Sequence, residues 1–215
     1  MTGLSLWKQN LGRVPAEVWT RTDLTSLVLA DNGLTELPPD IARLTQLKML
    51  DLGHNALTAV PDALGALEGL TDFLYLHDNR LTALPAALGR LRRLRYLNIS
   101  DNPFAGWPDV VCEMTGLAEL RAEGCGFTAL PEPIGRLTGL RELSLRGNKL
   151  GSLPETLGAL TELRLLDLRA NPLTRLPAAL GKLPKLEKLD LRWATSLGDA
   201  TVLAELERRG CRVYR

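Results

Sequence analysis

Hydrophobic and polar positions follow one pattern that repeats along almost the whole chain. The skeleton L-x-x-L-x-L-x-x-N-x-L-x-x-L-P-x-x-L-x-x-L returns every 23 residues, with a single step of 24. A fixed period in this range is typical of a solenoid, in which each unit buries its apolar edge only against its neighbours. Most recurrent residues are therefore architectural, and function has to come from the variable positions. The units begin at Leu24, Leu47, Leu70, Leu94, Leu117, Leu140, Leu163 and Leu186.

Each unit predicts one short strand followed by a turn. In residues 47–52, Leu50 and Leu52 alternate with variable residues, as in a strand with one buried face. Stacked units would place such strands about 4.8 Å apart in a parallel sheet. The asparagine after the strand can donate and accept, so asparagines of successive units can form a ladder that satisfies backbone groups in the turns. The ladder positions are Asn32, Asn55, Asn79, Asn102, Asn148 and Asn171.

The residues from Leu24 to Leu34, LTSLVLADNGL, resemble the leucine-rich repeat signature. The second half of each unit, as in Leu84–Leu91, is similar to the bacterial and plant intracellular class and to Ras-group repeats. The resemblance covers roughly Leu4 to Leu197. It implies an α/β solenoid, a horseshoe with a parallel β-sheet on the concave face. Short helical turns or extended segments would form the convex face.

The chain ends differ from the middle, as solenoid ends must. We expect a partial repeat at 1–23, seven repeats at 24–185, and a partial repeat with a capping helix and strand at 186–215. At the C-terminus, Asp199 is the expected cap of a helix that buries Val202, Leu203 and Leu206 and ends at Gly210. No polar helix precedes the first unit, which permits self-association through the N-terminal edge.

Two units depart from the skeleton. One extra residue precedes Leu74, which indicates either a bulge in the strand that re-aims a side chain or an insertion absorbed by the preceding turn. Later, Cys125 replaces the ladder asparagine and Ala122 replaces a core leucine. We expect structural roles for both.

Composition limits the classes of partner and the cellular compartment that we expect. The net charge is +1, from 26 basic and 25 acidic residues, which argues against a general polyanion or membrane-surface binder. The sequence contains no run of about 18 apolar residues, so no membrane-spanning helix is expected. The N-terminus lacks the pattern of a secretory signal. Three scattered cysteines are typical of reduced thiols in a cytoplasmic protein. Leucine-, arginine- and alanine-rich usage favours a bacterial source.

No catalytic, phosphate-binding or zinc-finger motif is present in the sequence. His54 and His77 lie one repeat apart with Asp51 and Asp78 nearby, which allows either a metal site or two solvent-facing residues. We favour the second interpretation and assign no metal and no cofactor. Cys112 has no histidine at a diagnostic spacing, so the chain is expected not to be an enzyme.

The residues that flank the strand leucines define the candidate partner-binding surface on the concave face. Aromatic and sulfur-containing side chains in its N-terminal half resemble interface hot spots. Its C-terminal half carries an arginine ladder, which indicates either cross-strand ion pairs with neighbouring carboxylates or a clamp for acidic groups of a partner. The candidate residues are Trp7, Met49, Asp51, Tyr75, His77, Tyr96, Arg121, Arg146, Arg169, Arg192 and Trp193.

These observations predict a non-catalytic module that binds a protein or peptide partner on its concave face. One alternative is the recognition domain of a ubiquitin-ligase-like or signalling effector. Another is anion or nucleic-acid binding through the arginine ladder, which the interleaved acidic residues disfavour because such binding needs a net positive surface.

Overall fold

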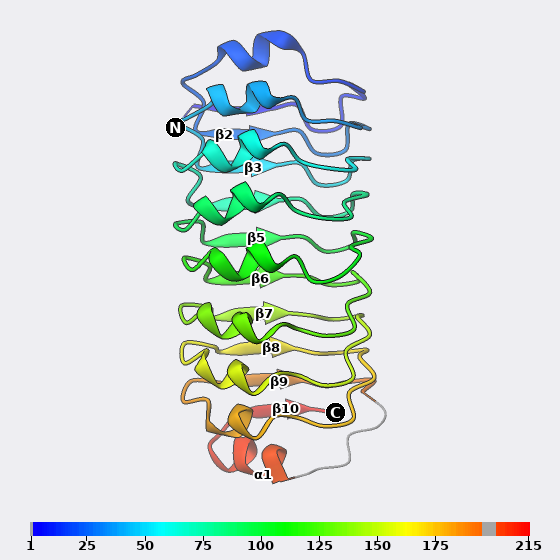
Figure 1. Cartoon of the computed structure of the whole chain (residues 1–215), viewed down its shortest axis with the longest axis vertical. Helices are drawn as coiled ribbons and strands as arrows, with labels where there is room; N and C mark the ends of the chain where they lie inside the picture. The colour runs from blue at the N-terminus through cyan, green and yellow to red at the C-terminus, as the bar shows by residue number, and fades with distance from the viewer. Residues whose placement is uncertain (1, 195–200) are drawn as a thin grey trace.

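The computed structural model describes residues 2–194 and 201–215 of the chain. Within them, ten parallel strands of three residues each form one sheet, ordered as in the sequence. Figure 1 shows the units stacked in chain order, with the termini near opposite ends of the stack. The strands are β1 (Gly3–Ser5), β2 (Ser26–Val28), β3 (Met49–Asp51), β4 (Phe73–Tyr75), β5 (Tyr96–Asn98), β6 (Glu119–Arg121), β7 (Glu142–Ser144), β8 (Leu165–Asp167), β9 (Lys188–Asp190) and β10 (Arg212–Tyr214).

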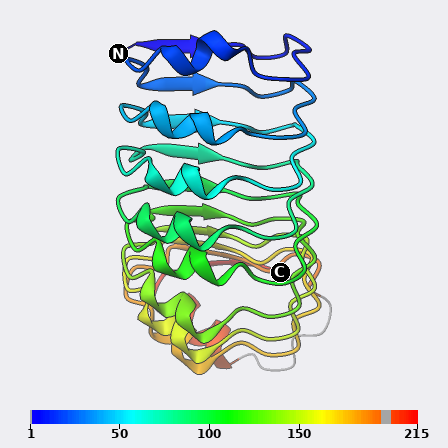
Figure 2. The same cartoon turned by 45° about the horizontal axis from the view of Figure 1, so that its top comes forward.

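Short 3-10 helices cover the side of the solenoid opposite the strands. Figure 2 shows these helices in one layer and the strands in another. This is the horseshoe α/β solenoid that the repeat pattern predicts, with a strand layer and a layer of short helical turns. The helices are η1 (Ala16–Thr20), η2 (Pro39–Arg43), η3 (Asp62–Ala66), η4 (Ala86–Arg90), η5 (Asp109–Glu113), η6 (Glu132–Arg136), η7 (Glu155–Ala159) and η8 (Ala178–Lys182).

Proline starts each 3-10 helix, as η3 illustrates. Pro61 is extended, with φ −72° and ψ 152°, and its carbonyl oxygen accepts from Leu64 N at 3.0 Å. That bond closes over three residues, which is the 3-10 pattern. Leu64 then points into the core and is fully buried. A Cβ added to Gly65 would lie 2.2 Å from Ala87 O, so glycine allows η3 and η4 to pack closely.

The central residue of each strand, a leucine in β1 to β9 and Val213 in β10, faces the core, and its two neighbours face away. Leu50, Leu74 and Leu97 are aligned across three strands and are fully buried. Leucines from the rest of every unit join them in one continuous core. The strand positions on either side of the leucine are left for the open face, where they are free to vary.

The 24-residue unit keeps its strand in register. Met49, Leu50 and Asp51 pair with Phe73, Leu74 and Tyr75, so of the two alternatives the bulge inside the strand is excluded and the insertion in the preceding turn, which we favour, remains. The extra residue lies in the turn before β4. There, Thr71 O and Asp72 O each accept one bond from the next unit. In neighbouring units a single carbonyl accepts both bonds, as Thr25 O does.

The asparagines lie where the chain leaves each strand. Asn79 Nδ2 donates to Leu52 O at 2.9 Å and to Leu76 O at 3.1 Å, and its Oδ1 accepts from Leu57 N at 3.0 Å. Cys125 reproduces the donor half of this pattern, because its thiol lies 3.2 Å from Glu123 O. Its sulfur does not replace the amide oxygen as an acceptor.

The two ends of the sheet are covered differently. β1 is the first strand of the sheet and pairs with β2 on one side only. At the other end, β10 pairs with β9, and helix α1 (Thr201–Arg208) buries the side chains of Val202, Leu203 and Leu206. The expected helix cap, Asp199, lies outside the described residues. Among the described residues, no helix combines the length and apolar character needed to cross a bilayer.

Candidate functional site

Three aromatic rings form the most distinctive group on the open face of the sheet. We call Phe73, Tyr75 and Tyr96 the aromatic cluster. The ring centres of Tyr75 and Tyr96 are 4.9 Å apart, those of Phe73 and Tyr96 5.5 Å, and those of Phe73 and Tyr75 6.0 Å. Met49 is aligned with Phe73 on the adjacent strand. The guanidinium of Arg121 lies 6.0 Å from the Tyr96 ring on the other side.

The two tyrosines are only partly exposed, and this alters their acidity. Burial raises the pKa of Tyr96 to about 12, although nearby Arg121 acts in the opposite direction. Burial, with a smaller contribution from Asp51, also raises the pKa of Tyr75. Both phenols therefore remain neutral at physiological pH. They present apolar ring surface together with a hydroxyl that can form hydrogen bonds.

Phe73 is the member of the cluster that was not among the predicted site residues. Its side chain is 42% exposed, although it is large and apolar. The signal was present in the sequence, because Phe73 directly precedes the first strand leucine, as Met49 and Tyr96 do. The extra residue before Leu74 obscured that alignment.

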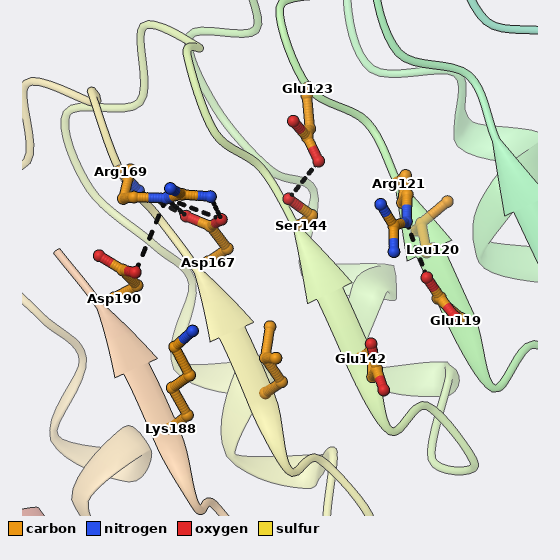
Figure 3. A pocket seen from close by; sticks show the side chains of 11 residues that line it. Glu119, Leu120, Arg121, Glu123, Glu142, Ser144, Asp167, Arg169, Lys188 and Asp190 are labelled. Atoms are coloured by element: carbon orange, nitrogen blue, oxygen red, sulfur yellow. Dashed lines mark hydrogen bonds and ion pairs between the residues drawn. The ribbon is translucent and has the colours of Figure 1, made fainter. Parts of the chain in front are cut away.

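Arginines on the C-terminal half of the face are paired with carboxylates. Arg169 Nε lies 2.9 Å from Asp167 Oδ1 and 3.7 Å from Asp190 Oδ2 (Figure 3). Arg192 Nη2 donates to Asp190 Oδ2 at 2.8 Å. Asp190 is almost completely buried, and burial alone would raise its pKa, but the bonds from Arg192 bring that pKa below its ordinary value. Hydrogen bonding to Asp167 raises the pKa of Arg169. These contacts favour the ion-pair interpretation of the arginine ladder.

The strands between the aromatic cluster and these arginines line a hollow of about 200 Å³. Arg121 Nε donates to Glu119 at 2.7 Å, and Ser144 Oγ donates to Glu123 at 2.7 Å (Figure 3). Glu119 is aligned with Glu142 on the next strand, so two like charges face each other. Both signs of charge therefore occur on this part of the face, and Arg146, also exposed, adds another positive group.

Two histidines approach each other next to the aromatic cluster. His54 Nε2 and His77 Nε2 are 3.3 Å apart, and His54 Nδ1 lies 2.6 Å from Asp78 Oδ2. Burial lowers the pKa of His77, and the neighbouring His54 lowers it further. His77 packs over Gly53, where an added Cβ would lie 2.3 Å from the ring.

Of the remaining predicted residues, Asp51 is aligned with Tyr75 on the adjacent strand, and the two tryptophans lie far from the cluster. Asp51 Oδ1 accepts from the amide of Gly53 at 2.9 Å, so its carboxylate shapes the turn. Trp7 and Trp193 are 58% and 64% exposed and mark opposite ends of the face. Arg192 lies 5.7 Å from the Trp193 ring and equally far from Tyr214, a ring that the sequence prediction also missed.

The cysteines are poorly placed for nucleophilic chemistry. All three are free and buried, and burial raises the pKa values of Cys112 and Cys125, the latter to about 11. Because the thiolate is the reactive form, these thiols are held in their inert state.

Comparison with solved structures shows similar folds in bacterial and plant proteins. The leucine-rich repeat domain of the type III effector XopL is 26% identical, with a TM-score of 0.82, over 99% of this chain and 75% of that chain. The protein LIC12759 of Leptospira interrogans is 26% identical, with a TM-score of 0.76, over 99% and 59%. The Arabidopsis receptor kinase HAESA, solved with the peptide hormone IDA and the co-receptor SERK1, is 28% identical, with a TM-score of 0.70, over 88% and 32%.

The chain thus spans less than two thirds of the LIC12759 and HAESA chains. No curated protein matches it. The leucine-rich repeat profile matches residues 22–81 and 134–194. The unmatched stretch between these two segments contains Cys125 and Ala122, the departures from the skeleton. More than half of the sequence matches the profile and the whole sheet has the corresponding fold, so the chain belongs to the leucine-rich repeat family.

Proposed function

We propose that this chain is a non-catalytic interaction module that binds a protein or peptide partner on its concave face. Leucine-rich repeat folds commonly mediate protein–protein interaction. The observation that carries the proposal is the aromatic cluster. Rigid aromatic side chains at the centre of a surface are the residues that most often dominate binding energy.

The size of the face supports a macromolecular partner. Ten strands at about 4.8 Å spacing extend over roughly 43 Å, which can hold a standard interface of about 800 Å² per partner. The hollow on strands β6 to β9 is partly open to solvent, whereas small metabolites favour enclosed pockets. A partner that spans several strands fits this surface better.

The charge pattern supports an interface with an apolar centre and a mixed polar rim. Phe73, Tyr75 and Tyr96 would form the centre, and Arg121 and Glu119 would lie at its edge. The matching partner surface would place an apolar side chain over the rings and carry both signs of charge around it. HAESA, a structural relative, was solved with a peptide hormone, which is consistent with a peptide partner here.

The arginine ladder gives weaker support to anion or nucleic-acid binding. Arg169 and Arg192 already contact the buried carboxylates of Asp167 and Asp190, so their charge is largely neutralised within the protein. The likeness to the XopL domain supports the second alternative, in which the chain is the recognition part of a larger effector. We further propose a cytoplasmic location, which the three free thiols support.

Site-specific crosslinking tests the concave assignment. A photoreactive phenylalanine analogue at Phe73 should crosslink to a partner from native lysate, and the same analogue at Arg136, which is exposed on the convex helix η6, should not. Tyr75→Ala combined with Tyr96→Ala should abolish capture while leaving the folded state intact. Equal crosslinking from both positions, or full capture by the double variant, would contradict the proposal.

A further inference from the structure

We propose that His54 and His77 form a binding site for a divalent transition-metal ion such as Zn²⁺. The two side chains come from adjacent units and meet at the N-terminal half of the concave face. The inference goes beyond the partner-binding function and does not depend on it.

The distance between the two ring nitrogens fits a shared metal ion. His54 Nε2 and His77 Nε2 are 3.3 Å apart. Two nitrogens bound to one tetrahedral zinc ion at about 2.0–2.1 Å would be separated by roughly 3.3–3.4 Å. The ring planes are inclined at 81°, and their centres are 4.7 Å apart. The rings thus meet nearly at right angles, with their Nε2 atoms closer together than their centres.

A carboxylate prepares His54 for this role. Asp78 Oδ2 lies 2.6 Å from His54 Nδ1, the ring nitrogen that faces away from His77. A carboxylate that accepts from one nitrogen fixes the tautomer whose other nitrogen carries a free lone pair. The same arrangement supports many metal-binding histidines in proteins. The Nε2 atom of His54 is therefore available as a ligand.

The backbone and local packing hold both rings in place. His54 has φ 53°, in a turn position that Asp31, Asp78 and Asp101 occupy in neighbouring units. His77 lies over Gly53, because only glycine leaves room for its ring. Two rings held just beyond the ends of successive strands β3 and β4 are preorganised, so little side-chain entropy is lost when an ion binds.

The metal-free arrangement brings the Nε2 atoms of the two histidines into contact. Two Nε2 atoms in contact need a shared proton, since two lone pairs repel each other. A metal ion would replace the shared proton and bind both imidazoles in their neutral form.

The described residues supply two ligands and no group of three. The other coordination positions would belong to water or to a donor group of a bound partner. An open hollow borders His54 and is also lined by Trp7, Asp31, Asn55 and Asp78. Asp31 is paired with Lys8, but the charges of Asp51, Asp78 and Asp101 all act on His77 and favour a cation over an anion at the pair.

Zinc titration of the full chain, stripped of metal by a chelator, tests the site. Calorimetry at neutral pH should give saturable binding of one Zn²⁺ per chain. His54→Gln and His77→Gln should each lower the affinity by more than about tenfold, and Asp78→Asn by about 10- to 100-fold. Asp62→Asn is the matched control, because that exposed carboxylate lies on the convex helix η3 and should leave affinity unchanged.

Nuclear magnetic resonance keeps the test decisive if a variant fails to fold. The chain has only two histidines, so the Cε1 proton signals of both should shift together in the wild-type protein as Zn²⁺ is added. Absence of saturable binding by the wild type would overturn the proposal. Retention of wild-type affinity by a folded His77→Gln variant, or zinc binding that leaves the two signals unchanged, would also overturn it.

Discussion

Replacement of Asn102 by alanine should destabilise the protein strongly through the loss of one hydrogen-bond acceptor. The side chain is 2% exposed and makes four bonds. Its Nδ2 donates to Leu76 O, Ile99 O and Ser100 O at 2.9–3.1 Å, and its Oδ1 accepts from Leu81 N at 3.0 Å. The consequences of truncation differ between the two ends of the amide.

The three carbonyl groups would each keep another donor. Leu76 O retains Asn79, Ser100 O retains the amide of Asp78, and Ile99 O retains the thiol of Cys125. The buried amide of Leu81 would keep none. An orphaned buried amide costs about 1–3 kcal/mol, and the lost donor bonds add smaller amounts, so the expected loss is about 2–4 kcal/mol.

Cys125→Ala provides the matched comparison. Cysteine fills the same ladder position but supplies only a weak donor, so its removal should cost about 1 kcal/mol less than the removal of Asn102. Equilibrium urea unfolding measures the stability loss of both variants. Circular dichroism and tryptophan fluorescence should both be recorded, because repeat arrays can unfold in steps. Equal losses for the two variants, or a loss below about 1 kcal/mol for Asn102→Ala, would refute the acceptor argument.

Further predictions concern packing and pH. Gly65→Ala should destabilise the protein by about 1–3 kcal/mol in chemical unfolding, because its Cβ would collide with Ala87 O. Gly151→Ala, with open space around it, should change stability by less than about 1 kcal/mol. Similar losses for the two variants would contradict the packing argument. The pKa of Asp190 is lowered from 3.8 in the folded state, so its contribution is present above that pH and is lost as pH falls through the folded value. Thermal unfolding should show the gap between wild type and Asp190→Asn closing in acid, and a constant gap would contradict this. Tyr96 has its pKa raised from 10.0 to about 12, so the folded state should lose stability across that interval, and Tyr96→Phe should reduce the loss.

The sequence was informative about the fold because leucine spacing is fixed by stacking geometry. One strand and one turn per unit follow from the positions of Leu50 and Leu52 and from the asparagine after them. The extra residue before Leu74 could not be placed from sequence alone, since a bulge and a longer turn have the same length. In the structure the buried leucines stay in register across the sheet, so the extra residue lies in the turn.

The candidate site was less predictable, because it depends on side-chain directions. The sequence showed that Tyr75 and Tyr96 flank the strand leucines, but the contact between their rings depends on their rotamers. The interval of 23 residues between His54 and His77 indicates adjacent units, yet it cannot give the separation of two ring nitrogens. Similarly, the pairing of Arg169 with Asp167 rather than with a partner is a matter of local geometry.

Cys125 has a mechanical consequence for the array. Asparagine occupies the ladder position from Asn32 to Asn102 and again from Asn148 to Asn171. Between these two runs, the Cys125 thiol donates hydrogen bonds but supplies no amide oxygen to accept one. On the N-terminal side of this joint, the amide of Phe104 bonds to Asn102 O at 2.9 Å within its own turn. Under load or mild denaturant, the solenoid should therefore open first at this joint. The half with the aromatic cluster would then separate from the half with the arginine–aspartate pairs. The concave face would thus consist of two segments joined by a less stable contact.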